Sequence, residues 1–353
     1  MKLKVDGREV KVGSREFMWL KVATLLDGND LRIPLHVIHG EETGTVLGLF
    51  ASIHGTEYYQ NRIIRRIVNE TDPRSIKGTI LAVPVANPLA FSHATRQSPS
   101  PPEETVDFSN LNRVFPGRRS TPLFGSTEPT DVSLTMKMAQ VLVDEVVEKC
   151  THIVDFHGQM PGMALKKMLF NRDDASREMA RVFGLGVLHD PPENSPRKGM
   201  LTPLTDYAGT LGISCIVAEI GGGGHSERFE RQVEEIGVQG TRNVMIHLGM
   251  QEGEMKLPDR QLIFTDAPHV RSTTGGYYVT DLLPEDVGVG KPPKEVRRED
   301  SLGFVYSPYT LDVKEEVICP ADGFLYACRV SGLVEAQNEV SAVANLNGSR
   351  WID

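Results

Sequence analysis

Short apolar runs alternate with amphipathic stretches over the first two thirds of the chain. Four runs have the length and composition of buried strands, and they cover residues 45–53, 79–85, 152–156 and 213–218. Three stretches repeat apolar residues every three to four positions and predict helices, at residues 58–69, 134–146 and 227–249. This alternation predicts an α/β domain with a mainly parallel or mixed central sheet and helices on both faces.

The pattern changes at two places. Between residues 94 and 130 it fails, and the stretch is rich in Pro, Ser and Thr, which predicts a long loop of the kind that is usually functional. Beyond residue 260 only short β-like runs occur, punctuated by Gly and Pro. We therefore expect a catalytic domain at residues 1–260 and a small all-β domain at residues 261–353, either a barrel or a sandwich.

Composition restricts the function classes. The 353 residues carry a formal net charge of −9, which argues against nucleic acid and anionic lipid as partners. No run of 18 apolar residues predicts a membrane helix, and the first 12 residues do not resemble a signal peptide. The four cysteines form no C-x-x-C pair, so we expect reduced thiols and a cytoplasmic protein.

Candidate metal ligands follow two of the predicted strands. His54 and Glu57 come directly after the run at 45–53, and His157 comes directly after the run at 152–156. Because parallel strands meet at one edge of a sheet with their carboxyl ends, these three side chains are expected to converge. Two His and one Glu, with a fourth position left for water, are typical of hydrolytic zinc sites.

The other histidines and a glycine run are weaker candidates for a functional site. His36 and His39 are three apart in a strand-like run and are expected on opposite faces, and His152 lies at the start of its predicted strand, away from the edge that carries His157. His225 follows a glycine run and has no partner at ligand spacing. That run, Gly221–Gly224, follows a predicted strand and offers an alternative interpretation as a phosphate-binding loop. However, the G-x-G-x-x-G spacing fails at Ser226, and no Walker lysine follows.

Further polar residues lie near the same predicted edge. Glu219 follows the run at 213–218, and a carboxylate next to a metal-activated water is a natural general base. Arg96, Asn112 and Arg113 lie in the irregular segment. Two arginines and an amide in a loop suggest recognition of a substrate carboxylate.

These motifs together resemble the succinylglutamate desuccinylase and aspartoacylase family, relatives of the zinc carboxypeptidases. The matching residues, in the order of the family, are His54-Gly55-x-Glu57, Asn87-Pro88, Arg96, Asn112-Arg113, His157 and Glu219. The resemblance implies one zinc ion per chain held by His54, Glu57 and His157, with Glu219 as the catalytic acid and base. It also implies that Arg96 polarises the scissile carbonyl, while Asn112 and Arg113 bind the substrate carboxylate.

Two details refine the resemblance. Asn110 stands where aspartoacylases usually have Asp, and the continuation Arg113-Val-Phe-Pro-Gly117 is similar to the bacterial branch of N-acyl amino acid deacylases. The C-terminal part resembles a lipoyl-like barrel-sandwich, but Asp312 stands at the position of the carrier lysine.

The sequence therefore predicts a zinc-dependent amidohydrolase that removes an acyl group from an N-acylated amino acid or a related small carboxylate. A homo-oligomer is expected, with a dimer favoured. Two alternatives stay open: a metallocarboxypeptidase that acts on short peptides, and a non-catalytic module that binds a small molecule.

Overall fold

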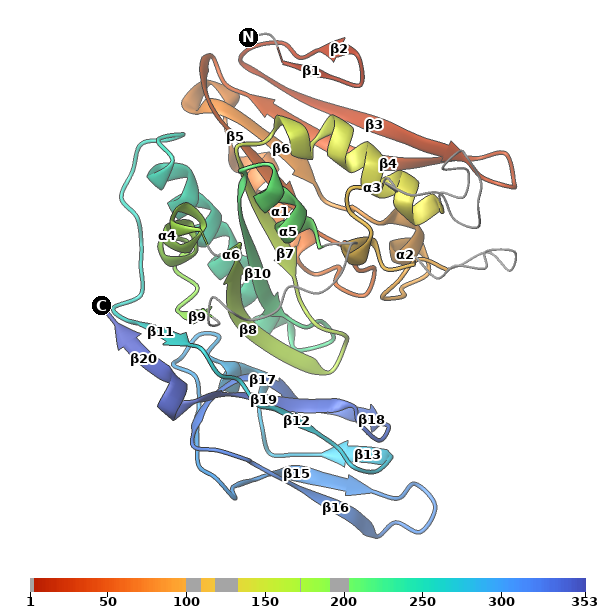
Figure 1. Cartoon of the computed structure of the whole chain (residues 1–353), viewed down its shortest axis with the longest axis vertical. Coiled ribbons are helices and arrows are strands. Elements are labelled where there is room, and N and C mark those ends of the chain that lie inside the picture. Colours follow the sequence, from red (N-terminus) through yellow and green to blue (C-terminus); the bar gives the residue numbers. More distant parts are fainter. Residues whose placement is uncertain (1–2, 100–108, 118–132, 172, 191–202) are drawn as a thin grey trace.

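A computed structural model of the chain describes residues 3–99, 109–117, 133–171, 173–190 and 203–353. Its centre is a twisted sheet with helices on both sides, and the strands of the last 93 residues lie in the lower part of Figure 1. Of the irregular segment predicted at 94–130, only residues 94–99 and 109–117 belong to the described part.

Four parallel strands form the middle of the sheet. In spatial order they are β6 (Lys77–Val83), β5 (Glu42–Phe50), β7 (His152–His157) and β10 (Ser214–Gly221). Nearly all residues of β6, β7 and β10 and the last four residues of β5 are buried, because helices cover both faces, and this burial explains their apolar composition. Each of the four strands was predicted from its apolar run, although β10 continues three residues beyond the predicted end.

Antiparallel strands extend the sheet on both sides, so the sheet is mixed. On one side lie β4 (Asp30–His39) and β3 (Ser14–Thr24), and on the other side lies β8 (Met163–Phe170), next to β10. The apolar runs did not identify β3 or β8 as strands. In β3 the apolar run is short and has charged residues before and after it, and β8 contains two adjacent lysines.

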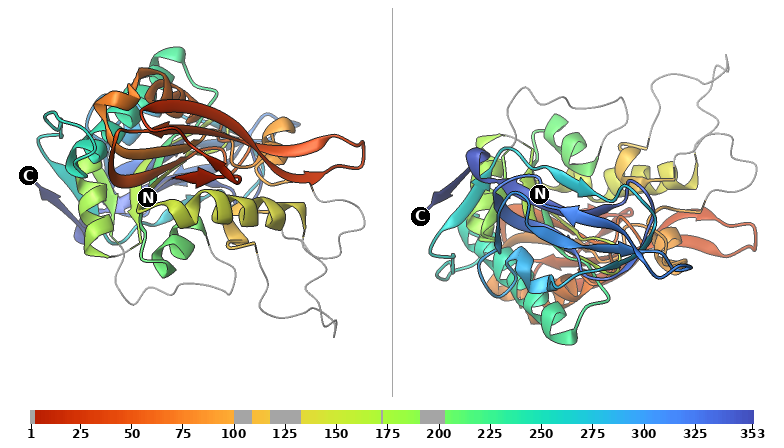
Figure 2. Two further views of the ribbon diagram at one scale, coloured as in Figure 1. Left: turned by 90° about the horizontal axis from the view of Figure 1, so that it is seen from above. Right: turned by 90° about the horizontal axis from the view of Figure 1, so that it is seen from below.

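The two faces of the sheet are covered by different helices (Figures 1 and 2). Buried residues of α1 (Asn61–Glu70), α4 (Asp174–Phe183) and α6 (Glu227–His247) share one hydrophobic core. Buried residues of α3 (Leu134–Glu145) and α5 (Leu204–Thr210) form a second core on the other face, where the short α2 (Pro88–Ser92) also packs. The helical periodicity of α1 is confirmed, since Ile63, Ile64, Ile67 and Val68 are its buried residues.

The C-terminal strands continue the same sheet. Strand β17 (Gly323–Arg329) pairs with β8, then β19 (Glu339–Asn345) pairs with β17, and β12 (His269–Arg271) pairs with β19. A separate four-stranded sheet has the order β16 (Val313–Ile318), β15 (Ser301–Tyr306), β13 (Gly276–Val279) and β18 (Gly332–Val334). The predicted α/β class with additional C-terminal β structure is thus confirmed, whereas the division at residue 260 stays a prediction.

The remaining elements are short. The strands are β1 (Lys4–Val5), β2 (Arg8–Glu9), β9 (Val187–His189), β11 (Gln261–Phe264), β14 (Glu295–Val296) and β20 (Ser349–Ile352). The 3₁₀ turns are η1 (Pro73–Ser75), η2 (Leu111–Arg113), η3 (Val147–Lys149), η4 (Pro284–Val287) and η5 (Leu346–Gly348). Among the described residues, no helix is long and apolar enough to cross a membrane. All four cysteines are buried free thiols.

Candidate metal centre

His54 and Glu57 lie in the turn that leads from β5 to α1. The turn packs so closely against α2 that a Cβ atom at Gly55 would meet the carbonyl carbon of Ala90 at 2.1 Å. Only glycine allows this approach of two backbones. Both side chains are 2% exposed, and Nδ1 of His54 lies 2.8 Å from Oε1 of Glu57. The close packing of the turn therefore directs both side chains inward.

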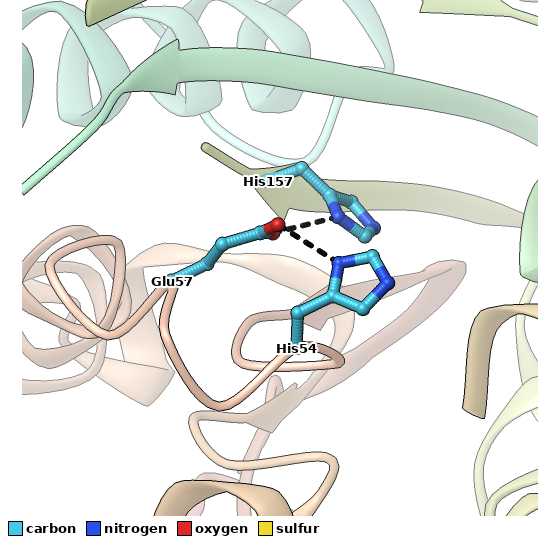
Figure 3. Close-up of side chains that lie close together, drawn as sticks. All are labelled: His54, Glu57 and His157. Carbon is cyan, nitrogen blue, oxygen red and sulfur yellow. Dashed lines mark hydrogen bonds and ion pairs between the residues drawn. The ribbon is translucent and has the colours of Figure 1, made fainter. Parts of the chain in front are cut away.

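His157 completes the group from the neighbouring strand. It is the last residue of β7, and its Nδ1 lies 2.9 Å from Oε2 of Glu57, so the carboxylate lies between the two imidazoles (Figure 3). One potential ligand atom of each residue lies within 4.8 Å of the others. The convergence that the sequence predicted for His54, Glu57 and His157 is thus present in the structure.

The outer nitrogens of the two imidazoles contact oxygen acceptors. Nε2 of His157 lies 2.9 Å from Oδ2 of the buried Asp155, and Nε2 of His54 lies 3.2 Å from Oδ1 of Asn110. That amide oxygen also accepts the backbone N–H of Asn112. Each Nε2 can donate to its oxygen, which leaves the Nδ1 of each ring facing Glu57 as the ligand atom for a metal ion. Such outer contacts fix the tautomer and orientation of metal-binding histidines in many proteins.

The charges of the group stabilise one another. Burial alone would lower the pKa of His157, but the carboxylates of Asp155 and Glu57 outweigh it and raise that pKa well above its usual value. Burial would likewise raise the pKa of Glu57, but His157 and His54 lower it. Glu57 is therefore ionised. The raised pKa of His157 means that its Nδ1 holds a proton facing Glu57. A metal ion bound to this nitrogen would take the place of that proton.

This donor set fits a divalent metal ion. Two Nδ1 atoms and one carboxylate converge in a buried place, and both histidines are oriented by outer hydrogen bonds. Two His with one Glu form the protein part of several catalytic zinc sites, in which the fourth position stays open for water or substrate.

Two further candidate residues lie beside the group. Arg96 donates from a guanidinium nitrogen to Oε1 of Glu57 at 2.6 Å, while its side chain stays 42% exposed. Glu219 is in register with His157 on one side and with Lys167 of β8 on the other. Burial raises the pKa of Glu219, although the positive charges of His157 and Lys167 act against this.

Asn112 and Arg113 lie in η2, close in sequence to Asn110. The side-chain oxygen of Asn112 accepts the backbone N–H of Leu204 at 3.0 Å, which ties η2 to the start of α5. The guanidinium of Arg113 is exposed and donates to the carbonyl of Asn112 at 2.6 Å. No hydrogen bond or ion pair joins Arg113 to His54, Glu57, Arg96 or His157 in the described part of the chain, so the structure does not link these two residues directly to the metal-binding group.

Comparison with known proteins identifies the family of this chain. Residues 43–248 match the family model described as the succinylglutamate desuccinylase/aspartoacylase catalytic domain, which is more than half of the chain. The chain belongs to this family. It is accordingly a deacylase-type hydrolase that acts on amide bonds, and the alternative of a non-catalytic binding module is wrong.

Individual relatives agree with the family. The chain is 27% identical over 320 residues to N-alpha-acetyl-L-2,4-diaminobutyric acid deacetylase of Halomonas elongata, covering 89% of this chain and 86% of that protein. Its fold is similar to the ectoine utilization protein EutE (DoeB) of Ruegeria pomeroyi, with a TM-score of 0.74, 24% identity and coverage of 94% and 95% of the two chains. It is also similar to a succinylglutamate desuccinylase/aspartoacylase of Rhodobacter sphaeroides, with a TM-score of 0.75, 20% identity and 98% coverage of each chain.

Sequence reasoning missed three residues at the site of this family member. Asp155 lies two positions before His157, and the two-residue period of a strand places both side chains on one face, which is a signal that could have been used. Asn110 was noted only as a departure from aspartoacylases, yet it holds the imidazole of His54. Lys167 belongs to the strand that the apolar runs did not reveal, so nothing pointed to its place beside Glu219.

We expect Asp155→Asn to weaken zinc binding by about 10- to 100-fold, the usual effect of losing a carboxylate behind a metal-binding histidine. The substitution keeps the size of the side chain but removes the charge that orients and polarises His157. Titration with zinc against a competing chelator measures the effect. The exposed Asp174→Asn serves as the control and should bind zinc like the unchanged protein. Equal affinity in both variants would show that Asp155 does not support a metal site.

Proposed function

We propose that this protein is a zinc-dependent deacylase that hydrolyses N-acylated amino acids. The observation that carries the proposal is the carboxylate of Glu57 between two imidazoles whose outer nitrogens are held by Asp155 and Asn110. His54, Glu57 and His157 would hold one zinc ion per chain. Zinc supplies Lewis acidity in such a site, which activates a water molecule and polarises a carbonyl group.

Glu219 is the proposed general base and acid. It lies next to His157 across β7 and β10, and its raised pKa suits a group that must both take and release a proton. It takes a proton from the attacking water as the hydroxyl adds to the amide carbon. It then gives this proton to the nitrogen as the C–N bond breaks, so that the products are a carboxylic acid and a free amine.

Arg96 is the proposed partner of the carbonyl oxygen. One of its N–H groups is used by Glu57, and the part of the guanidinium that remains exposed has further donors. The pairing with Glu57 fixes the arginine before substrate arrives, and a fixed donor at a developing oxyanion contributes about 3–4 kcal/mol to transition-state stabilisation.

Asn112 and Arg113 are the proposed binding residues for a free carboxylate of the substrate. Arg113 is exposed and its planar guanidinium matches a carboxylate, while η2 is anchored through Asn112 to α5 and through Asn110 to His54. The relative from Halomonas elongata is named for an N-acetylated amino acid that has such a carboxylate, which supports this class of substrate.

A panel of substrates tests the proposal. We expect release of free amino acid from N-acetyl-2,4-diaminobutyrate, an N-acyl aspartate or N-succinylglutamate, measured with ninhydrin. Release from dipeptides alone would instead favour the metallocarboxypeptidase alternative.

With the best substrate of the panel, Glu219→Gln should lower kcat at least about 100-fold, the usual scale for general acid–base catalysis. The amide keeps the shape of the side chain but accepts no proton, so bound zinc should be retained. Glu235→Gln, an exposed change on α6, is the matched control and should keep normal turnover. Near-normal turnover of the Glu219 variant would remove it from the catalytic residues.

Arg113→Lys should raise KM markedly, because lysine keeps the charge but loses the planar pair of donors. Converting the carboxylate of the substrate to an amide should raise KM by a similar factor. The two losses of affinity should not add if both changes remove the same interaction. The exposed Arg74→Lys is the control. If the two losses add in full, the carboxylate is bound by other residues.

A further inference from the structure

A cavity lies away from the proposed catalytic residues. Its volume is about 400 Å³, and it lies where the α/β part meets the C-terminal strands. The lining includes Lys166 of β8, Leu185 after α4, Ile236 of α6, Pro292 after η4 and Trp351 of β20. Successive residues of a strand point to opposite faces, so Lys166 faces away from the side on which Lys167 accompanies Glu219.

Lys166 is unusual because its ammonium is buried without a counter-charge. The residue is 9% exposed, and its hydrogen bond goes from Nζ to the carbonyl of Gly288 at 2.6 Å. Within the described chain no carboxylate pairs with it, and burial lowers its pKa to about 8, so it is still mostly charged at neutral pH. An ammonium has three donors, and two of these have no acceptor among the described residues.

A buried charge without a partner costs free energy, so such a group commonly pairs with an ion or a ligand. The cavity supplies room for a ligand directly at this charge. Arg260 adds a second cation to the lining, with its guanidinium 4.4 Å from the centre of the Trp351 ring. No ion pair of Arg260 occurs among the described residues.

The other charged groups around the cavity do not neutralise the ammonium of Lys166. Lys291 is already bound to Asp286, with 2.7 Å between Nζ and Oδ1. Asp259 also lines the cavity, but it is exposed like its neighbour Arg260, so water screens both of these charges, and Lys166 is the buried one. The rest of the lining consists of four glycines, three prolines, Leu185, Ile236 and Trp351. These residues carry no side-chain charge, which favours a ligand with an apolar body over a small inorganic ion.

We propose that this cavity binds a small organic carboxylate, with the ammonium of Lys166 as its anchor. The carboxylate accepts hydrogen bonds from Lys166, and the hydrocarbon part packs against Ile236 and the ring of Trp351. Because the walls come from both parts of the chain, the ligand connects β8 and α6 with the C-terminal β20. The proposal does not depend on the catalytic role of Glu219 or on the bound metal.

Calorimetric titration of the whole protein with benzoate tests the proposal, and benzamide is the uncharged probe of the same shape. We expect benzoate to bind measurably and benzamide at least about tenfold more weakly, a difference of about 1.4 kcal/mol. Lys166→Met keeps the length of the side chain and removes an unpaired buried charge, so it should fold. It should weaken benzoate binding at least about tenfold.

Lys167→Met is the matched control, since it removes the same charge from the adjacent residue on the opposite face of β8. Its affinity for benzoate should equal that of the unchanged protein. Ile236→Trp keeps Lys166 but fills the cavity, and it should also weaken binding. The proposal is overturned if benzoate does not bind, if benzamide binds equally well, or if Lys166→Met binds benzoate as tightly as the Lys167 variant.

Discussion

Glu57 carries a carboxylate almost fully removed from water, and the arrangement around it follows from the need to compensate that charge. The imidazoles of His54 and His157, the guanidinium of Arg96 and the backbone N–H of Gly158 all lie within hydrogen-bonding distance of its two oxygens. These partners come from three separate segments of the chain. They meet because β5 and β7 are parallel neighbours whose carboxyl ends lie at the same edge of the sheet.

The sheet extends this arrangement beyond the metal-binding group. From β7 to β10 and β8, residues in register place Glu219 next to His157 and Lys167 next to Glu219. The ammonium of Lys167 lies 5.1 Å from the centre of the Tyr326 ring, which belongs to β17 in the C-terminal part. A single row of side chains thus leads from the proposed catalytic carboxylate to the C-terminal strands. The same strand β8 presents Lys166 to the cavity on its other face, so this antiparallel strand connects both sites.

The central strands and several candidate site residues could be predicted from the sequence. Buried parallel strands are apolar runs, and the residues directly after them lie at one edge of the sheet. That rule located His54, Glu57, His157 and Glu219. The rule failed for β8, because two adjacent lysines interrupt the apolar run of a strand that is mostly buried. The roles of Asn110 and Asp155 depend on which nitrogen of each imidazole faces which oxygen, and only tertiary geometry determines this. The cavity at Lys166 is lined by six segments that are distant in the sequence, so no local pattern could reveal it.

The central claim is that His54, Glu57 and His157 form one metal site that the hydrolysis requires. Elemental analysis of the purified protein, combined with the deacylation assay before and after chelation, tests this most directly. Such a site predicts close to one equivalent of zinc per chain, loss of activity on chelation, and recovery when zinc is returned. It also predicts that His157→Ala retains neither the metal nor the activity. Full zinc content in that variant, or undiminished hydrolysis by the metal-free protein, would contradict it.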